Sequence, residues 1–156
     1  MSPLNKSDAR VGRTAALRLL ARREHSREEL RHKLLKRGID AVEAKALLEH
    51  LENTQLLSDA RFTESYIYAR RARGFGPVRI RMELQARGVA DSLIDEHLDE
   101  RGEHWQELLY TQYRKRYGDE PVHDRREYAR RARFLQQRGF PHEMIRRLLG
   151  DLRRLR

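Results

Sequence analysis

The stretch Leu34-Leu35-Lys36-Arg37-Gly38-Ile39 decides the fold, because its pattern recurs at 84–89 and at 135–140 with the three glycines 50 and 51 residues apart. Each copy consists of a leucine, two variable residues, an arginine, a glycine and an apolar residue. Further apolar residues follow each glycine six and ten positions on: Ala44 and Leu48, Ile94 and Leu98, Ile145 and Leu149. Positions i and i+4 share one face of a helix, so each glycine precedes a helix with an apolar stripe. The chain is therefore predicted to repeat one unit three times.

Each unit is predicted to form three helices, because proline and glycine cluster at boundaries and no segment alternates as a strand would. In the first unit we expect a helix over 11–24, a second that Ser26 and Glu29 open with a capping box and Gly38 closes, and a third that Asp40 and Glu43 open in the same way. The predicted fold class is all-α, with tandem three-helix repeats at 1–54, 55–102 and 103–156 in an elongated, curved, solenoid-like molecule.

The other two units follow the same plan. In the second, a helix begins at Ser58 and breaks at Gly74-Phe75-Gly76, and the next begins at Pro77, whose missing amide costs nothing at a first helical position. A third helix carries Leu93, Ile94 and Leu98. The last unit is predicted to have helices over 104–117, 124–137 and 141–152, with a loop at 118–123.

Composition points to a thin core and an anionic partner. Among 156 residues, 34 lysines and arginines face 24 aspartates and glutamates, which gives a net charge of +10, and 29 of the cations are arginine. The guanidinium group binds phosphates and carboxylates with two parallel hydrogen bonds. The chain has no cysteine, no apolar run long enough to cross a membrane and no signal-peptide core at its start. We therefore expect a cytoplasmic protein that binds polyanions or acidic protein surfaces.

Charge follows the repeat. Net charge is +7 over 1–37, −4 over 38–69, +5 over 70–87, −6 over 88–124 and +8 over 125–156. If equivalent helices stack, their arginines line one side of the molecule. The alternative is that these charges solvate helix faces and form local pairs, as Glu83 can with Arg79 and Arg87. That alternative leaves two arginine runs without acidic partners close in sequence: Arg70, Arg71 and Arg73, and Arg130, Arg131 and Arg133.

Motifs of common enzymes are missing, so we expect no catalytic residues, cofactor or metal. The sequence has no GxxxxGK[ST] loop, HExxH or GxSxG. Gly74-Phe75-Gly76 is interpreted as a turn rather than a phosphate cradle, because Pro77 follows it. The acidic run from Asp95 to Glu103 is interpreted as a solvated face, and the seven histidines are scattered. A tyrosine stripe at 110, 113 and 117 is expected to pack in the core, although rings beside cations also stack on unpaired bases.

The central segment closely resembles the RecX family of regulatory proteins. The matching residues are Leu57 to Phe62, Tyr66, Arg70, Gly74 to Pro77, Arg79, Ile80, Glu83, Leu84 and Arg87 to Val89. The likeness extends to Ser26, Arg27, Glu29 to Arg31, Lys33 and Leu34 before this segment and to Arg138 to Phe140 after it, so it covers nearly the whole chain. The sequence departs at Gln55, where the family often has a turn glycine, at Thr63, where it often has alanine, and at Arg131, where the first two repeats carry Leu30 and Ile80.

The resemblance implies a regulator of the RecA recombinase. Such proteins bind in the groove of the RecA filament on single-stranded DNA and lower its ATPase, strand-exchange and coprotease activities, which modulates DNA repair and the SOS response. We expect a cytoplasmic monomer whose partner is RecA on single-stranded DNA, with direct DNA contact. The alternatives are a helix-turn-helix protein that acts on DNA without RecA and a scaffold for other partners. The candidate contact residues are Arg27, Arg31, Arg70, Arg71, Arg73, Arg79, Arg81, Arg87, Arg130, Arg131 and Arg133, and the candidate structural residues are Gly38, Gly74, Gly76, Pro77, Gly88 and Gly139.

Overall fold

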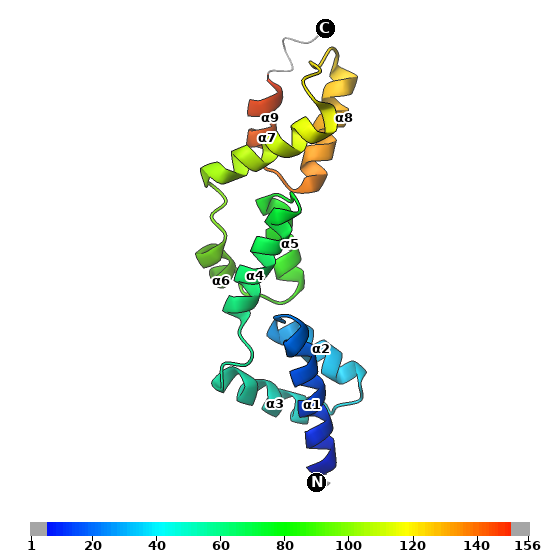
Figure 1. Cartoon of the computed structure of the whole chain (residues 1–156), viewed down its shortest axis with the longest axis vertical. Coiled ribbons are helices and arrows are strands. Elements are labelled where there is room, and N and C mark those ends of the chain that lie inside the picture. Colours follow the sequence, from blue (N-terminus) through cyan, green and yellow to red (C-terminus); the bar gives the residue numbers. More distant parts are fainter. Residues whose placement is uncertain (1–5, 151–156) are drawn as a thin grey trace. The chain divides into compact units, whose positions relative to one another are not determined.

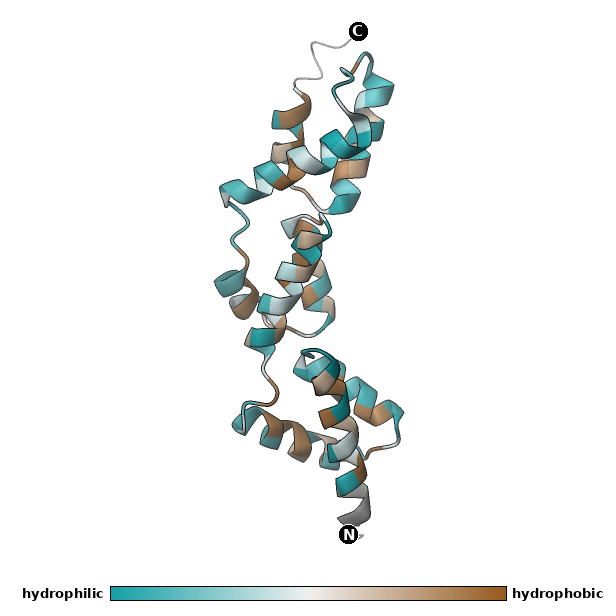
Figure 2. Ribbon diagram, viewed as in Figure 1, coloured by the Kyte–Doolittle hydropathy of each residue, from teal (hydrophilic) through white to brown (hydrophobic). Residues whose placement is uncertain are grey.

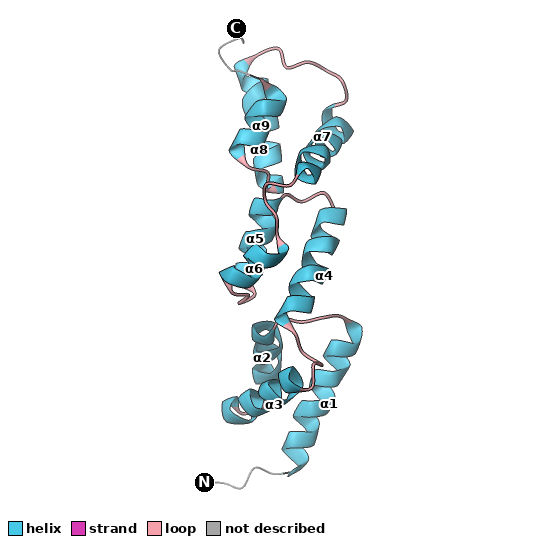
Figure 3. Ribbon diagram, turned by 90° about the vertical axis from the view of Figure 1, so that its left-hand side faces the viewer, coloured by secondary structure: helices cyan, strands magenta, loops and turns pink. Residues whose placement is uncertain are grey.

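The structure is a computed structural model that describes residues 6–150, with side chains from residue 9. All regular structure in these residues is helical (Figure 3), which confirms the predicted all-α class. The helices are α1 (Lys6–Arg22), α2 (Arg27–Lys36), α3 (Ala41–Asn53), α4 (Asp59–Ala72), α5 (Pro77–Ala86), α6 (Asp91–His97), α7 (Glu103–Tyr117), α8 (Arg125–Arg138) and α9 (His142–Leu149).

The described residues divide into two compact units. The first comprises 6–66 and 84–94, and the second comprises 67–83 and 95–150 (Figure 1). The divisions fall inside α4, α5 and α6, so the units do not coincide with the repeats predicted at 1–54, 55–102 and 103–156. Those boundaries stay a prediction, as do the elongation and curvature of the molecule.

Helix ends match the predicted caps, with one exception. The Ser26 hydroxyl accepts from the Glu29 amide at 3.0 Å while the Glu29 carboxylate accepts from the Ser26 amide, so the first predicted capping box is confirmed. The second is wrong. Asp40 accepts from the amide of Val42, two residues on, and Glu43 does not reach back: its Oε1 atom is buried without a hydrogen-bond partner among the described residues.

Each unit has its own small core. In the first unit, α1, α2 and α3 pack around residues such as Ala16, Leu30 and Leu48, all of them fully buried. In the second unit, α7, α8 and α9 pack around a cluster centred on Leu109 and Leu135. Figure 2 shows that hydrophobic residues form interrupted bands on the helices rather than whole apolar faces. The helices of each unit therefore share a thin core, as the composition predicts.

The repeated stretch is a helix stop. Gly38, Gly88 and Gly139 have φ of 85°, 78° and 98°, the left-handed conformation that glycine adopts without strain. The apolar residue after each glycine donates its amide to the leucine carbonyl five residues earlier, at 3.1 to 3.2 Å, and both apolar side chains are buried. This is the Schellman arrangement, in which one apolar contact accompanies the reversal of the chain. The leucine, the glycine and the apolar residue of the repeat each have a role in it.

Two of these helix stops also accept hydrogen bonds from the first residues of another helix. In the first unit, the Ser26 hydroxyl at the start of α2 donates to the carbonyl of Arg87 at the end of α5, at 2.7 Å. In the second unit, the amides of Gly76 and Val78 at the start of α5 donate to the carbonyls of Arg138 and Gly139 after α8, at 2.8 and 2.9 Å. A carbonyl end with partial negative charge thus meets an amide end with partial positive charge.

The contact between the start of α5 and the end of α8 explains why Gly76 of the Gly74-Phe75-Gly76 motif is a glycine. A Cβ atom on Gly76 would lie 2.5 Å from the Gly139 carbonyl oxygen, so only glycine permits the approach. Because the Gly76 and Val78 amides already have carbonyl partners, this turn does not present them to a phosphate.

Replacing Ser26 with alanine tests the junction of the first unit. The change removes a helix cap and leaves the partly buried Arg87 carbonyl without its donor, so we expect the free energy of unfolding to fall by about 2 kcal/mol. Urea unfolding followed by circular dichroism measures this. Ser65, exposed in the middle of α4, is the control, and its alanine variant is expected to change the free energy by less than about 0.5 kcal/mol. Equal effects at the two serines would contradict the assignment.

Gln55, in the turn after α3, has the left-handed backbone conformation that glycine usually adopts. Its φ is 61°, and the Leu56 amide donates to the Leu51 carbonyl at 2.9 Å, as in the other helix stops. A residue with a Cβ atom is strained in this conformation. Gln55→Gly is therefore expected to stabilise the chain by about 0.5 to 1 kcal/mol in urea unfolding, after allowance for the greater freedom of glycine in the unfolded chain.

Thr54 supplies the control for the Gln55 change. It lies one residue earlier with φ of −90°, and its hydroxyl donates to the His50 carbonyl at 2.9 Å. Thr54→Gly is expected to destabilise the chain. A loss of stability at both positions would mean that Gln55 is not strained.

Candidate arginine-rich interface

The candidate arginines of α2 and α5 are engaged in ion pairs. Arg31 pairs with Glu28 at 3.0 Å, and Arg79 pairs with Glu83 at 3.0 Å. The same two helices carry Arg27, which pairs with Glu52, and Arg81, which pairs with Asp95 and Glu100. The Arg87 guanidinium lies 4.8 Å from the centre of the Tyr66 ring. Local pairing therefore accounts for much of the charge on these two helices, as the alternative interpretation held for Arg79 and Glu83.

Arg70 is held inside the second unit. Its guanidinium lies 3.8 Å from the centre of the Phe75 ring and pairs with Glu83 at 2.6 Å, so only 19% of its side chain is exposed. Arg79 and Arg138 contact the same ring, at 4.4 and 4.8 Å. Three guanidinium groups around one ring fix the turn that precedes α5, because cations bind the negative faces of aromatic rings. The first arginine run is thus split between a structural residue and the exposed Arg71 and Arg73.

Arg131 is also internal, with 3% of its side chain exposed. It donates to the Tyr113 hydroxyl at 2.6 Å, to the Glu120 carbonyl at 2.7 Å and to the Glu127 carboxylate at 2.5 Å. The guanidinium thus joins α7, the loop after it and α8, in the place where α2 and α5 bury Leu30 and Ile80. Burial alone lowers the pKa of Arg131, but its hydrogen bonds to Tyr113 and Glu127 outweigh burial and raise that pKa.

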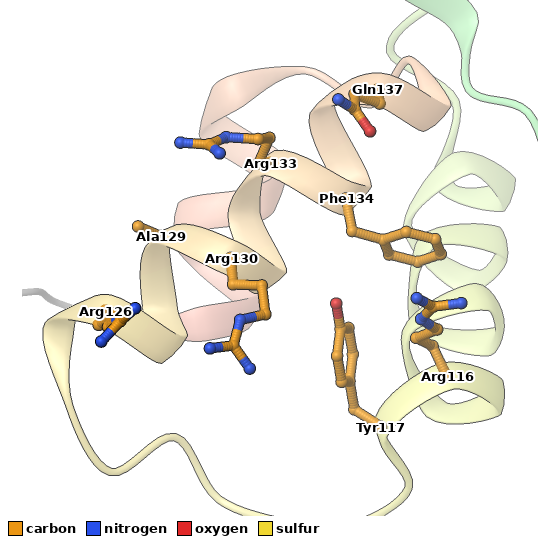
Figure 4. A pocket seen from close by; sticks show the side chains of 8 residues that line it. All are labelled: Arg116, Tyr117, Arg126, Ala129, Arg130, Arg133, Phe134 and Gln137. Carbon is orange, nitrogen blue, oxygen red and sulfur yellow. The ribbon is translucent and has the colours of Figure 1, made fainter.

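Among the candidate arginines, those that remain exposed and unpaired lie in the second unit. Within the described residues, Arg71, Arg73, Arg130 and Arg133 are exposed and form no ion pair. Arg130 and Arg133 line a groove of about 700 Å³ between α7 and α8 (Figure 4). Arg73 lines a second hollow of about 310 Å³. The two share Arg116 and Phe134, so they adjoin.

Several residues of this surface are not among the candidate contact residues predicted from the sequence. The groove adds Arg116 and Arg126, and the second hollow adds Lys115 and Arg138. Arg126 was detectable in principle, because Arg126, Arg130 and Arg133 are spaced i, i+4 and i+7 and so share one face of a helix. The tyrosine stripe is only partly as expected: Tyr113 and Tyr117 are half-buried, whereas Tyr110 is 48% exposed and outside the core.

The described residues offer no arrangement typical of a metal site. No group of three or more histidines, aspartates or glutamates within 6–150 is placed to hold an ion. Of the predicted acidic face, Asp95 and Glu100 pair with Arg81. His25 is a core residue, since it is 1% exposed and its ring nitrogens lie 3.1 Å from the Arg23 carbonyl and 2.8 Å from the Lys33 ammonium. Burial lowers the pKa of His25.

No helix within 6–150 has both the length and the apolar composition to span a membrane.

The fold and this surface define an all-helical protein of repeated three-helix domains with an arginine-lined groove. Family models described as the first, second and third three-helix domains of RecX match residues 13–51, 58–98 and 103–149. Regulatory protein RecX of Halorhodospira halophila is 47% identical over 134 residues, or 86% of this chain and 83% of that protein. Its counterpart in Pseudomonas syringae pv. tomato is 44% identical over 138 residues, or 88% and 89%. The chain belongs to the RecX family.

A solved structure supports the fold. The crystal structure of RecX from Lactobacillus salivarius aligns with a TM-score of 0.77 over 96% of this chain and 99% of that one, at 22% sequence identity. The three-helix construction is therefore shared at low identity, which is consistent with a fold set by helix stops and buried apolar residues.

The ion pair of Glu127 with Arg131 predicts a pH dependence of stability. The hydrogen bond from Arg131 lowers the pKa of Glu127. A folded-state pKa below the unfolded value stabilises the fold above the unfolded pKa and less and less below it. We therefore expect the pair to contribute fully above about pH 4.3, the ordinary pKa of glutamate, and to lose its contribution as the pH falls further.

Urea unfolding at a series of pH values tests this expectation. Glu127→Gln is expected to flatten the acid limb of the stability curve relative to the unmodified chain. Glu143, also in the first turn of a helix and exposed, provides the matched control, and Glu143→Gln is expected to keep the steeper limb. Identical limbs in all three proteins would contradict the coupling.

Proposed function

We propose that this chain is a regulatory protein that binds RecA and its filament on single-stranded DNA and inhibits the ATPase, recombinase and coprotease activities of RecA. Membership of the RecX family supports the regulatory role, since the relatives are named regulatory proteins. The chain acts in this proposal by binding alone, as a cytoplasmic monomer without a cofactor. Inhibition follows from bridging neighbouring RecA protomers or from blocking filament growth and its conformational cycle.

One observation carries the proposal beyond the family name. Four candidate arginines of the second unit are exposed and have no carboxylate partner among the described residues: Arg71, Arg73, Arg130 and Arg133. An unpaired guanidinium retains its full capacity to bind phosphates or carboxylates. A RecA–DNA filament is expected to offer both groups, and the sugar-phosphate backbone is a dense array of negative charge.

The proposed contact residues follow from exposure and pairing. From the sequence-based candidates we keep Arg71, Arg73, Arg130 and Arg133 as the principal contacts. Arg70 and Arg131 are structural and are left out. The paired arginines of α2 and α5 stay weaker candidates, because a partner must first displace their carboxylates; they are Arg27, Arg31, Arg79 and Arg81, with Arg87 beside Tyr66.

The test is the rate of ATP hydrolysis by RecA on single-stranded DNA with substoichiometric amounts of this protein. We expect inhibition by the unmodified chain. Arg71→Gln together with Arg73→Gln is expected to raise the half-inhibitory concentration about tenfold or more, since one hydrogen bond to a charged group contributes roughly 1.5 kcal/mol or more. Circular dichroism should show an unchanged helix content, because both side chains are exposed.

A control of equal charge separates specific contact from net charge. Arg146 and Arg147 on α9 are also exposed and form no ion pair within the described residues, and their double glutamine variant is expected to inhibit like the unmodified chain. An unchanged ATPase rate with the unmodified protein, together with strong sequence-selective binding to duplex DNA, would favour a DNA-binding protein that acts without RecA.

A further inference from the structure

The groove between α7 and α8 has the size and lining of a nucleotide site. Two of its residues, Arg116 and Tyr117, come from the last turn of α7. The other six lie on α8: Arg126, Ala129, Arg130, Arg133, Phe134 and Gln137. The volume of about 700 Å³ lies within the range of small-molecule sites, roughly 300 to 1,000 Å³. Four of the eight lining residues are arginines and none is acidic.

Aromatic rings occupy the space between the helices. Tyr117 and Phe134 lie edge to face with their centres 5.8 Å apart. Figure 4 shows both rings in the groove, with Arg130 on one side of them and Arg116 on the other. Both side chains are half-buried, so part of each ring remains accessible at the surface. A flat heterocycle can stack on such a surface, and stacking tolerates any base because every base has a π-face.

Arginines follow the groove along α8. Arg126, Arg130 and Arg133 share one helix face, and the first two are separated by about 6 Å along the axis, from a rise of 1.5 Å per residue. That distance is comparable with the spacing of neighbouring phosphates in an extended strand. Within the described residues these three arginines form no ion pair. Gln137 adds a neutral side chain with both a donor and an acceptor, which suits the edge of a base.

Arg131 links the two helices that form the groove. Arg131 lies 4.6 Å from the centre of the Tyr117 ring and joins α7 to α8 through Tyr113 and Glu127. The adjoining hollow continues the basic lining past Phe134 to Arg73, Lys115 and Arg138. A site with rings in its centre and cations along its length fits a chain of nucleotides better than an acidic peptide, because only the nucleotide chain has a flat ring and a negative charge in every residue.

We propose that this groove binds an unpaired nucleotide of a single strand, with its base stacked on Phe134 beside Tyr117 and its phosphates bound by Arg126, Arg130 and Arg133. The inference rests on the proposed function for its setting, since single-stranded DNA is part of that target. It deepens the proposal by assigning the strand contact to one groove of the second unit.

The test measures binding of the full chain to a fluorescent oligothymidylate by anisotropy, without RecA. Ala129 is exposed in the groove, and a glutamate there lies three residues after Arg126 and four before Arg133. Ala129→Glu is expected to pair with both arginines, to keep the helix intact and to weaken binding about tenfold or more. The matched control, Ala129→Gln, has nearly the same shape without the charge and is expected to bind almost as the unmodified chain does.

A second comparison separates the base from the phosphates. Phe134→Leu keeps an apolar side chain in the packing but removes the ring, so it is expected to weaken oligothymidylate binding about fivefold to tenfold while leaving affinity for an abasic strand of equal length nearly unchanged. Thermal unfolding checks that the variant is folded. If it is not, Arg130→Gln with Arg133→Gln tests the same site, and its salt slope is expected to fall by about 0.7 for each phosphate that the variant no longer neutralises.

The outcomes distinguish this inference from the proposed function. Equal binding by the two Ala129 variants, or equal loss on normal and abasic strands with Phe134→Leu, would overturn the nucleotide site. Competition by thymidine monophosphate as effective as by the strand would also overturn it, because the groove would then serve free nucleotides. RecA ATPase inhibition is measured in parallel: intact inhibition with a failed groove removes only the inference, and strand binding in the groove without inhibition removes only the proposed function.

Discussion

The structure depends on the contact between the carbonyl end of one helix and the amide end of another. In the first unit Ser26 donates to Arg87, and in the second Gly76 and Val78 donate to Arg138 and Gly139. Both contacts satisfy backbone groups that a helix end leaves unpaired, and both require the chain to reverse tightly at a glycine. In a chain with little apolar surface, these polar contacts supply order that a larger core provides in other proteins. The helix stops themselves account for the leucine, the glycine and the final apolar residue that the three copies share.

Much of the fold could be predicted from the sequence, because the signals that set it are local. A helix cap involves residues three apart, and a helix stop involves residues five apart. The pairs Ser26 with Glu29 and Leu34 with Ile39 can therefore be recognised from the sequence alone. The failure at Glu43 shows the limit of such signals. Asp40 satisfies the second amide of α3 rather than the third, and the reciprocal bond is then not made. The choice between two neighbouring amides depends on side-chain geometry that spacing alone does not contain.

The candidate site was less predictable, because the state of an arginine depends on groups far away in sequence. Arg70 pairs with Glu83, and Arg81 pairs with Glu100, so neither partner is found by inspecting one helical turn. Arg131 departs from the apolar pattern, yet whether it is buried depends on Tyr113 and on the carbonyl of Glu120, which only the folded loop brings together. Counting arginines therefore locates basic segments but does not separate structural arginines from available ones.

The difference between α8 and the helices α2 and α5 is one of stoichiometry. From 125 to 138 the chain has six arginines and a single acid, Glu127, and Arg131 engages that acid from inside the unit. The arginines of the outer face are thus left without a carboxylate on their own helix, whereas α2 and α5 have acids within reach. Hydrogen bonds from the Arg131 guanidinium to Tyr113 and to the Glu120 carbonyl offset part of the cost of burying it, although its Nε atom has no partner among the described residues. The consequence is a surface of one sign beside the two half-buried rings of Tyr117 and Phe134.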